Sequence, residues 1–280
     1  MRSALSAALC ILIFCAASWA NATEPVFDPQ ARASLVRIGD EIVWSQAADQ
    51  RMPHASITKL MLALLIMDNY NPDAIVTVSK AAAAKPPSKL GLRAGEEMRL
   101  EEMLSATLVK SANDACVALA DWHSGSEELF VAEMNRRAAE LGLYDTHFAD
   151  ACGFDKPDHY STAHDIVALV DVVLANPILA EMLMLPEVTV RTADTGRTFV
   201  LKNTNQLLGD YDGAMGGKTG YTNRAGPCLV AISERDGVQV LVVLLNAKNR
   251  WPDARRTFDL AFNHATQQPG DTMVARAQPQ

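Results

Sequence analysis

The sequence lacks clusters of basic residues. Its 280 residues contain 25 Lys and Arg against 33 Asp and Glu, which gives a formal net charge of −8. Nucleic-acid binding depends on clustered lysines and arginines that neutralise phosphates. The charge pattern therefore argues against a nucleic-acid partner.

Cysteine is also scarce. Of the five cysteines, only Cys116, Cys152 and Cys228 lie beyond the first 22 residues, and an odd number at wide spacing is not a disulfide framework. Cys116 falls in a helical run and Cys228 in an apolar strand, so small buried hydrophobic side chains are the default interpretation. An exported protein can still oxidise one pair, and the sequence does not decide which.

Long hydrophobic runs are absent apart from the N-terminal segment. Residues 1–22 combine Arg2, an apolar stretch over 11–17 and the small pair Ala20 and Ala22, which is typical of a secretory signal cleaved after Ala22. The alternative is a retained membrane span, but the run is shorter than the ~20 residues that a bilayer requires. Neither Cys10 nor Cys15 lies in a lipoprotein signal pattern. We therefore expect a secreted, periplasmic protein.

The mature chain would have 280 − 22 = 258 residues and a net charge of 24 − 33 = −9, because the signal contains one arginine and no acid. This length suits one large domain or two small ones. The segment 267–280 is polar, contains prolines and has no apolar periodicity, so it is predicted to be disordered. It lacks the basic amphipathic pattern of a helix that lies on a bilayer, and we expect no stable membrane anchor.

The order of predicted elements indicates an α+β fold without internal repeats. A β-hairpin is expected over 33–45, a short strand at 75–80, and a turn-rich loop over 85–98. Apolar periodicity predicts helices over 56–67, 100–108, 113–122, 127–141, 162–175, 177–185 and 253–265. Five further strands are expected over 187–192, 197–203, 212–222, 226–234 and 238–247. The hairpin is predicted to join the last strands in one sheet, covered by the first and last helices, with the middle helices in a second lobe.

The helix predicted over 56–67 is apolar on every side and contains one charged residue, Lys59. Helices of this kind are buried, and a buried ammonium must be paired or lose its proton. Ser56 lies three residues earlier, on the same helical face. A desolvated, neutral Lys59 could serve as the general base for a Ser56 nucleophile. The Ser-X-X-Lys pattern alone is weak, because it occurs by chance about once in a chain of average composition.

Two further motifs carry chemistry. The sequence "KSANDAC" places Ser111 and Asn113 in a polar break between helices, where a helix cap is the simpler interpretation. The sequence "GGKTGYT" places Lys218, Thr219 and Gly220 in a strand, where an ordinary turn is the simpler interpretation. A phosphate-binding loop does not fit, because Tyr211 occupies the position of its first glycine.

Taken together, the three motifs resemble the triplet of penicillin-binding proteins and serine β-lactamases. Ser-X-Asn begins 111 − 56 = 55 residues after Ser56, and Lys-Thr-Gly begins 218 − 111 = 107 residues later. The flanking sequences "PHASITKLM", "SKLGLRAGEEM", "HYSTAHDIVAL" and "GGKTGYTNRAGPCLVA" are similar to those of the low-molecular-mass D-alanyl-D-alanine carboxypeptidases. The similarity extends from about Ala33 to His264.

The resemblance implies a β-lactamase/transpeptidase-like fold, in which a five-stranded antiparallel sheet flanked by helices lies beside an all-helical subdomain. The catalytic domain would occupy 23–266 and the helical subdomain roughly 80–185, in a short form without the C-terminal β domain of larger relatives. The substrates would be peptidoglycan peptides ending in D-Ala-D-Ala, and β-lactams would be inhibitors. No cofactor and no metal are implied.

The resemblance also implies residue roles. Ser56 would be the nucleophile and Lys59 its base, with backbone N–H groups of Ser56 and Tyr221 as the oxyanion hole. Ser111 and Lys218 would pass a proton to the leaving amine. The set of expected site residues is Ser56, Lys59, Ser111, Asn113 and Lys218 for catalysis, and Thr219, Gly220 and Tyr221 for substrate binding. We also expect Lys218 to lower the pKa of Lys59 through charge repulsion.

Several alternatives stay open at this level. A carboxylate-binding arginine is expected near the last strand, and Arg250, Arg255 and Arg256 all compete for that role. DD-endopeptidase activity on cross-linked peptides is the nearest alternative function. A class A β-lactamase is disfavoured because the helical middle offers no clear Glu-X-X-X-Asn segment, and a silent wall-binding or penicillin-sensing module is a further possibility. The histidines, including His54 and His159, are not expected to act in the chemistry.

Overall fold

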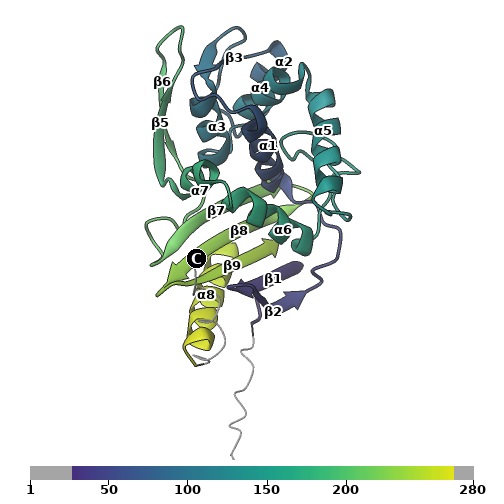
Figure 1. The fold of residues 1–280 in the computed structure, drawn as a ribbon, viewed down its shortest axis with the longest axis vertical. Helices are drawn as coiled ribbons and strands as arrows, with labels where there is room; N and C mark the ends of the chain where they lie inside the picture. The colour runs from purple at the N-terminus through teal and green to yellow at the C-terminus, as the bar shows by residue number, and fades with distance from the viewer. Residues whose placement is uncertain (1–26, 268–280) are drawn as a thin grey trace, which may run out of the picture.

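The central sheet is built from the two ends of the chain. The computed structural model describes residues 27–267, and its main sheet has five antiparallel strands in the order β2-β1-β9-β8-β7 (Figure 1). The strands are β1 (Ala33–Ile38), β2 (Glu41–Gln46), β7 (Ala214–Thr222), β8 (Gly226–Arg235) and β9 (Val238–Leu245). The expected joining of the N-terminal hairpin to the last strands is confirmed by the pairing of β1 with β9.

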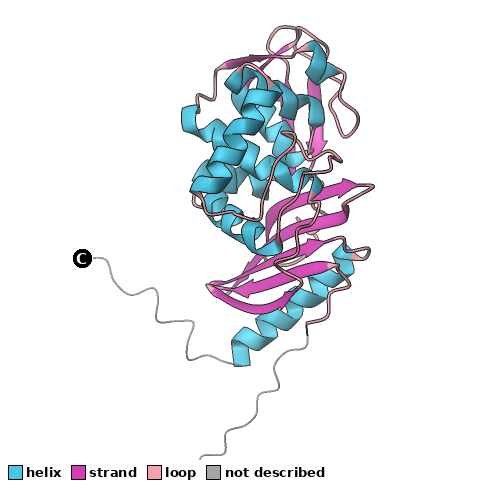
Figure 2. Cartoon of the chain, turned by 90° about the vertical axis from the view of Figure 1, so that its right-hand side faces the viewer, coloured by secondary structure: helices cyan, strands magenta, loops and turns pink. Residues whose placement is uncertain are grey.

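Helices cover both faces of this sheet, which explains why its central strands are almost entirely apolar. The long helix α8 (Arg250–Gln267) packs on one face against β8 and β9, and α6 (Ala163–Leu174) with α7 (Pro177–Met184) packs on the other. Figure 2 shows α8 on the opposite side of the sheet from the remaining helices. The prediction that the first helix covers the sheet is wrong, because α6 occupies that place.

The first helix instead forms the centre of the helical lobe. All eight residues of α1 (Lys59–Ile66) are buried, and α1 contacts α3 (Leu100–Val109), α4 (Asn113–Ser124), α5 (Glu127–Glu140) and α6. A helix that is apolar on every side can be surrounded by other helices. Only the 3-10 turn before it, η1 (Ala55–Thr58), contacts the sheet at β7 and β8. Ser56 therefore lies in this turn and not in the α-helix itself.

The helical lobe is not entirely helical. It includes the short helix α2 (Lys80–Ala83), the 3-10 turn η2 (Met67–Asn69) and two small antiparallel sheets. One sheet pairs β3 (Ile75–Thr77) with β4 (Glu97–Arg99), and the other pairs β5 (Glu187–Arg191) with β6 (Thr198–Lys202). β5 and β6 were expected from the sequence, but they form a separate hairpin because short-range pairing through a turn satisfies both strands locally.

Local sequence signals set several helix ends. The side chain of Thr162 accepts a hydrogen bond from the N–H of Asp165 at 3.0 Å and so caps the N-terminus of α6. Helix α8 begins before and ends after the predicted range of 253–265. The expected signal peptide over 1–22 and the tail beyond Gln267 lie outside the described residues.

Within residues 27–267, no single helix is long and apolar enough to cross a membrane. Helices α6 and α7 reach that length and composition only as a pair bent by 107°.

Candidate active site

The three motifs meet in one groove between the sheet and the helical lobe. The groove has a volume of about 550 Å³, and the expected site residues among its lining are Ser56, Ser111, Asn113, Thr219, Gly220 and Tyr221. Lys59 and Lys218 lie beneath its surface and are 0% and 1% exposed. A neighbouring hollow of about 630 Å³ contains no motif residue. The structure thus brings all eight expected residues together from η1, α1, the α3–α4 break and β7.

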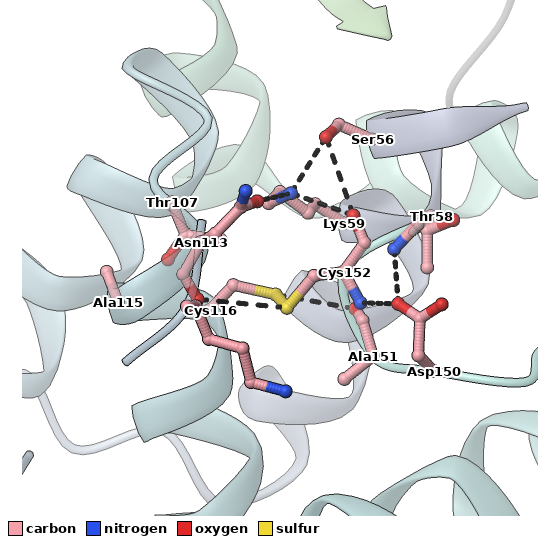
Figure 3. Close-up of a disulfide and its surroundings, with 12 residues drawn as sticks. Ser56, Thr58, Lys59, Thr107, Asn113, Ala115, Cys116, Asp150, Ala151 and Cys152 are labelled. Atoms are coloured by element: carbon pink, nitrogen blue, oxygen red, sulfur yellow. Dashed lines mark hydrogen bonds between the residues drawn. A yellow bond between two sulfur atoms is a disulfide. The ribbon is translucent and has the colours of Figure 1, made fainter. Parts of the chain in front are cut away.

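Lys59 makes three hydrogen bonds to the groove side of the lobe. As an ammonium, its Nζ donates to Ser56 Oγ at 2.8 Å, to Asn113 Oδ1 at 2.9 Å and to the carbonyl of Cys152 at 2.8 Å (Figure 3). Burial lowers the pKa of Lys59 to about 7, with the charge of Asp150 acting in the opposite direction. A substantial fraction of Lys59 is therefore neutral near pH 7.

The partners of Lys59 determine where its lone pair points. A neutral amine has two N–H donors, and the oxygens of Asn113 and Cys152 can only accept. The Asn113 oxygen is identified by its own nitrogen, which donates to the carbonyl of Pro86 at 3.0 Å. Ser56 is the one partner of the three that has a proton to give. The neutral lysine thus directs its lone pair at the Ser56 hydroxyl, as a general base must.

Lys218 and Ser111 form the second half of the site. The Nζ of Lys218 donates to Ser111 Oγ at 2.9 Å and to the carbonyl of Thr219 at 3.1 Å. Burial first, and then the charges of Lys59 and Arg250, lower the pKa of Lys218 well below its usual value. The expected repulsion between the two lysines lowers the pKa of Lys218, while burial is the main cause of the lowered pKa of Lys59.

One motif residue and one neighbour of a motif have strained backbones. Ala55, which precedes the nucleophile, has φ +49°, and Ser111 has φ +61°. Residues other than glycine rarely adopt this left-handed region, and such strain concentrates at functional sites.

The motif glycines permit close packing within the protein. A Cβ added to Gly220 would lie 2.8 Å from the carbonyl oxygen of His54 and 3.2 Å from the nitrogen of Ser56. At Gly217, with φ +129°, an added Cβ would lie 2.1 Å from the carbonyl oxygen of Val230. The structure shows that these glycines let β7 approach the Ser56 turn and the neighbouring strand.

Arg250 is distinguished from the other two candidate arginines by its place in the groove. Its Nη1 donates to the carbonyls of Gly220 at 2.9 Å and Cys228 at 3.0 Å, and it lines the groove. Arg255 pairs with Asp210, and Arg256 donates to the carbonyl of Asp28. Neither of these two lines the groove.

Asp114 was not singled out from the sequence, although it lies inside the motif "KSANDAC". It is fully buried and accepts hydrogen bonds from the N–H groups of Leu90, Gly91 and Leu92 at 2.9–3.0 Å. The carboxylate thereby holds the turn-rich loop 85–98 beside the groove. Its signal in the sequence was an acid among the apolar residues that begin α4.

Two cysteines that the sequence left unpaired form a disulfide. Cys116 and Cys152 are bonded, with their Cα atoms 6.1 Å apart. Cys228 is a free, buried thiol, as its default interpretation predicted. The bonded cysteines are 36 residues apart in the sequence, and only the tertiary structure brings the Cys152 loop against α4.

His54 and His159 form a buried stack behind the nucleophile turn. Their rings lie 4.7 Å apart, and the Nε2 atoms lie 3.0 and 2.7 Å from Thr58 Oγ1. Because Thr58 donates its proton to the carbonyl of Ala55 at 2.7 Å, both rings must donate through Nε2–H. The Nδ1 of His159 then accepts from the N–H of Ala149 at 3.1 Å, which the same tautomer requires. Two neutral imidazoles thus hold Thr58 and the turn around Ser56.

We expect this stack to make the protein less stable in acid. Burial lowers the pKa of His159 to about 4 and that of His54 well below 6.5. In the unfolded chain both histidines become protonated near pH 6.5, whereas in the folded chain they stay neutral to a lower pH. The free energy of unfolding should therefore fall as the pH drops from 6.5 towards 4. The slope is about 1.4 kcal/mol per pH unit for each histidine.

Replacing His159→Gln keeps an N–H donor for Thr58 but removes one titrating group. Urea unfolding between pH 7 and 4.5 should show a shallower loss of stability in this variant than in the wild type. His164→Gln, at an exposed histidine, is the matched control. An unchanged slope in His159→Gln would contradict the assignment of neutral, buried imidazoles.

The described residues contain no group of three or more His, Cys, Asp or Glu side chains that could hold a metal ion.

Comparison with known proteins supports one family. A family model described as D-alanyl-D-alanine carboxypeptidase matches residues 31–249. The chain is 33% identical over 255 residues to D-alanyl-D-alanine carboxypeptidase DacF of Bacillus subtilis, covering 88% of this chain and 65% of that protein. It is 31% identical to DacB2 of Mycobacterium tuberculosis, covering 87% and 88%. The chain thus spans about two thirds of the first relative and most of the second.

Solved structures agree with the sequence relatives. A D-alanyl-D-alanine carboxypeptidase from Mycobacterium tuberculosis has a TM-score of 0.79 at 30% identity, covering 85% of this chain and 93% of its own. A DD-transpeptidase from Streptomyces has a TM-score of 0.78 at 28% identity, covering 86% and 98%. The expected penicillin-binding, transpeptidase-like fold is confirmed.

Proposed function

Because the chain belongs to the D-alanyl-D-alanine carboxypeptidase family, we propose that it is a serine peptidase that removes the terminal D-alanine from peptidoglycan stem peptides. The observation that carries this proposal is the contact between Lys59 Nζ and Ser56 Oγ at 2.8 Å, at the floor of the groove. It supplies a nucleophile and its base in one turn of the chain.

Acylation would begin with proton transfer from Ser56 to Lys59 as Ser56 Oγ attacks the carbonyl of the penultimate D-alanine. The negative charge that develops on the carbonyl oxygen would be stabilised by the N–H groups of Ser56 and Tyr221. Ser56 lies at the start of a 3-10 turn, where N–H groups have no partner within the turn. The close approach of Gly220 to the Ser56 nitrogen brings the following residue, Tyr221, beside it.

The C–N bond would then break as the leaving D-alanine amine takes a proton. Ser111 is placed to donate it, because its hydroxyl is hydrogen-bonded to Lys218. Before the second step Lys59 would release the proton it took from Ser56 to solvent, and Ser111 with Lys218 would regain one. Water would then attack the ester on Ser56, with Lys59 again accepting a proton, and Ser56 would recover its proton as the shortened peptide leaves. Asn113 positions Lys59 through its oxygen and retains one free N–H for a substrate carbonyl.

The substrate peptide would add to the free edge of β7, which is the outermost strand of the sheet. Its terminal carboxylate would lie near Thr219 and Arg250, which line the groove on that side. A carboxylate there would raise the pKa of Lys218 and favour its protonation on binding.

Arg250→Leu should weaken recognition of the terminal carboxylate. Charge-assisted hydrogen bonds of this kind contribute about 1.5–3 kcal/mol, so kcat/KM for a D-Ala-D-Ala peptide should fall about 10- to 100-fold. Activity should be compared on the peptide and on its C-terminal amide, with Arg256→Leu as the control. If the ratio of kcat/KM for the peptide to kcat/KM for its amide is the same in Arg250→Leu as in the wild type, Arg250 does not bind the carboxylate.

DD-endopeptidase activity is the second candidate. A Pseudomonas aeruginosa protein named D-alanyl-D-alanine endopeptidase is 30% identical over 214 residues. Mass analysis of cross-linked wall fragments after digestion separates the two activities, since a carboxypeptidase leaves the cross-links intact.

A β-lactamase is disfavoured by the chemistry of the groove. Its lining includes no Asp or Glu side chain among the described residues, so no carboxylate is placed to activate water against a penicillin ester. We therefore expect β-lactams to act as inhibitors that remain bound to Ser56.

The proposed location is the periplasm, where peptidoglycan is found. Trimming stem peptides there would give the protein a role in cell-wall maturation and cell shape. The N-terminal segment has the composition of a secretory signal. The Cys116–Cys152 disulfide is also typical of proteins in oxidising compartments. Comparing the mass of the protein recovered from the periplasm with that of the whole chain tests cleavage after Ala22.

The proposed reaction is tested by two measurements on the purified wild type. D-Alanine release from a pentapeptide should be detectable, and a fluorescent penicillin should give a protein adduct that persists after the free label is removed. The absence of both would rule out the enzyme. Rapid loss of the adduct would favour a β-lactamase.

A further inference from the structure

The loop that contains Cys152 supplies one of the two acceptors that orient Lys59. Its carbonyl accepts from Lys59 Nζ at 2.8 Å, and the other acceptor is Asn113 Oδ1 at 2.9 Å. Figure 3 shows Lys59 between Ser56, Asn113 and Cys152. Since these two oxygens take both hydrogens of the neutral amine, their separation determines whether the lone pair meets the Ser56 hydroxyl.

The disulfide joins the elements that carry these two acceptors. Cys116 lies on α4, three residues after Asn113 and therefore about one turn away. Its partner is Cys152 itself, whose carbonyl is the second acceptor. One covalent bond thus connects the helix of Asn113 to the residue that binds Lys59. Both cysteines are buried.

Asp150 is the second anchor of the same loop. Its Oδ1 accepts from the N–H groups of Cys152 at 2.8 Å, Gly153 at 2.6 Å and Phe154 at 3.1 Å. The loop is also pressed against the nucleophile turn, because a Cβ added to Gly153 would lie 2.0 Å from the carbonyl oxygen of Ala55. The backbone of the loop is therefore fixed by three contacts: the hydrogen bonds to Asp150, the disulfide to α4 and the packing against the nucleophile turn.

We propose that the Cys116–Cys152 disulfide, with the Asp150 carboxylate, positions the Cys152 carbonyl so that Lys59 directs its lone pair at Ser56. This inference rests on the proposed function, because it concerns how the base of that reaction is held. The cysteines and Asp150 are positioning residues, since they act through Lys59 and do not touch the substrate.

The two anchors should affect the titration of Lys59 in opposite directions. Loss of the disulfide would loosen the loop and admit water, which weakens the desolvation of the amine and raises its pKa. Loss of the Asp150 charge would lower the pKa, because that charge stabilises the ammonium. The other titratable groups near Lys59 are Lys218 on β7 and His159 behind the turn.

The test measures the second-order rate of acylation by a fluorescent penicillin from pH 5 to 9. In Cys116→Ala/Cys152→Ala we expect the rate at high pH to fall by up to about 10²-fold, as misplacement of a catalytic group does, and the midpoint to move to higher pH. In Asp150→Asn, whose oxygen can still accept the loop N–H groups, we expect a rate at high pH close to the wild type and a midpoint at lower pH.

Val173→Ala is the control for lost core packing, because Val173 is buried in α6 and makes none of these contacts. It should lower the melting temperature and leave rate and midpoint unchanged. A double cysteine variant with the rate and midpoint of the wild type would overturn the proposal. If that variant does not fold, Asp150→Ala takes its place, because it removes the acceptor of the Cys152, Gly153 and Phe154 N–H groups, and a wild-type rate at high pH in Asp150→Ala would overturn the proposal. Failure of the wild type to react at all would instead contradict the proposed function.

Discussion

Ser56→Ala should abolish acylation by penicillin and reduce D-alanine release by at least about 10⁴-fold, since loss of the nucleophile in a serine peptidase costs up to about 10⁶-fold. The alanine has no oxygen to form the ester, and the oxyanion hole alone cannot replace it. Labelling with a fluorescent penicillin and a coupled D-alanine assay measure the two losses.

The fold should tolerate this change. The Ser56 side chain is only partly buried and makes hydrogen bonds to Lys59 and the carbonyl of Cys152. Lys59 keeps two acceptors without it. Ser45→Ala, on the exposed strand β2, is the matched control and should retain full activity. Undiminished D-alanine release by Ser56→Ala would refute the assignment of the nucleophile.

Lys59→Met should lower the acylation rate by about 10²- to 10⁴-fold, which is the usual contribution of a general base. Methionine fills a similar volume in the apolar helix but cannot accept the Ser56 proton. The folded protein should persist, because methionine keeps the apolar packing of α1, while the oxygens of Asn113 and Cys152 that lose their donor cost about 1–3 kcal/mol each.

The pH profile distinguishes loss of the base from a packing defect. With its pKa lowered to about 7, Lys59 is protonated below that pH and cannot accept a proton. The wild-type acylation rate should therefore rise about tenfold per pH unit below pH 7 and level off above it. Lys59→Met should lose this rise, and Lys80→Met on the surface should keep it. A wild-type profile that is flat from pH 5 to 9 would contradict Lys59 as the base.

Strongly patterned elements were predictable because their signals are local. The apolar face of α3, the Thr162 cap of α6 and the alternation of β5 and β6 depend on neighbours a few residues away. The partners of these elements were less predictable. β5 and β6 pair with each other outside the main sheet, and α6 takes the place expected for the first helix, because a periodic pattern indicates a buried face without naming what covers it.

The site residues likewise divide into those that the sequence predicted and those that it did not. Ser56, Lys59, Ser111, Asn113 and Lys218 stand in short motifs at a characteristic spacing, and the structure gathers them in one groove. Arg250 and Asp150 lie outside these motifs, and Asp114 lies inside one at a position for which the sequence predicted no role. Their roles depend on the loops they reach, which lie far from them in the sequence or adopt turns that composition does not specify.

The amino-acid sequence by itself determined that a serine and a lysine share one turn of a buried segment, and that the two further motifs accompany them. It also determined that Lys59 would be desolvated, since the surrounding residues are apolar. Only the tertiary structure decided which oxygens receive the two hydrogens of that amine. That choice depends on a helix and a loop 36 residues apart, joined by the Cys116–Cys152 bond, and such a separation is fixed by packing and not by any local preference of the chain.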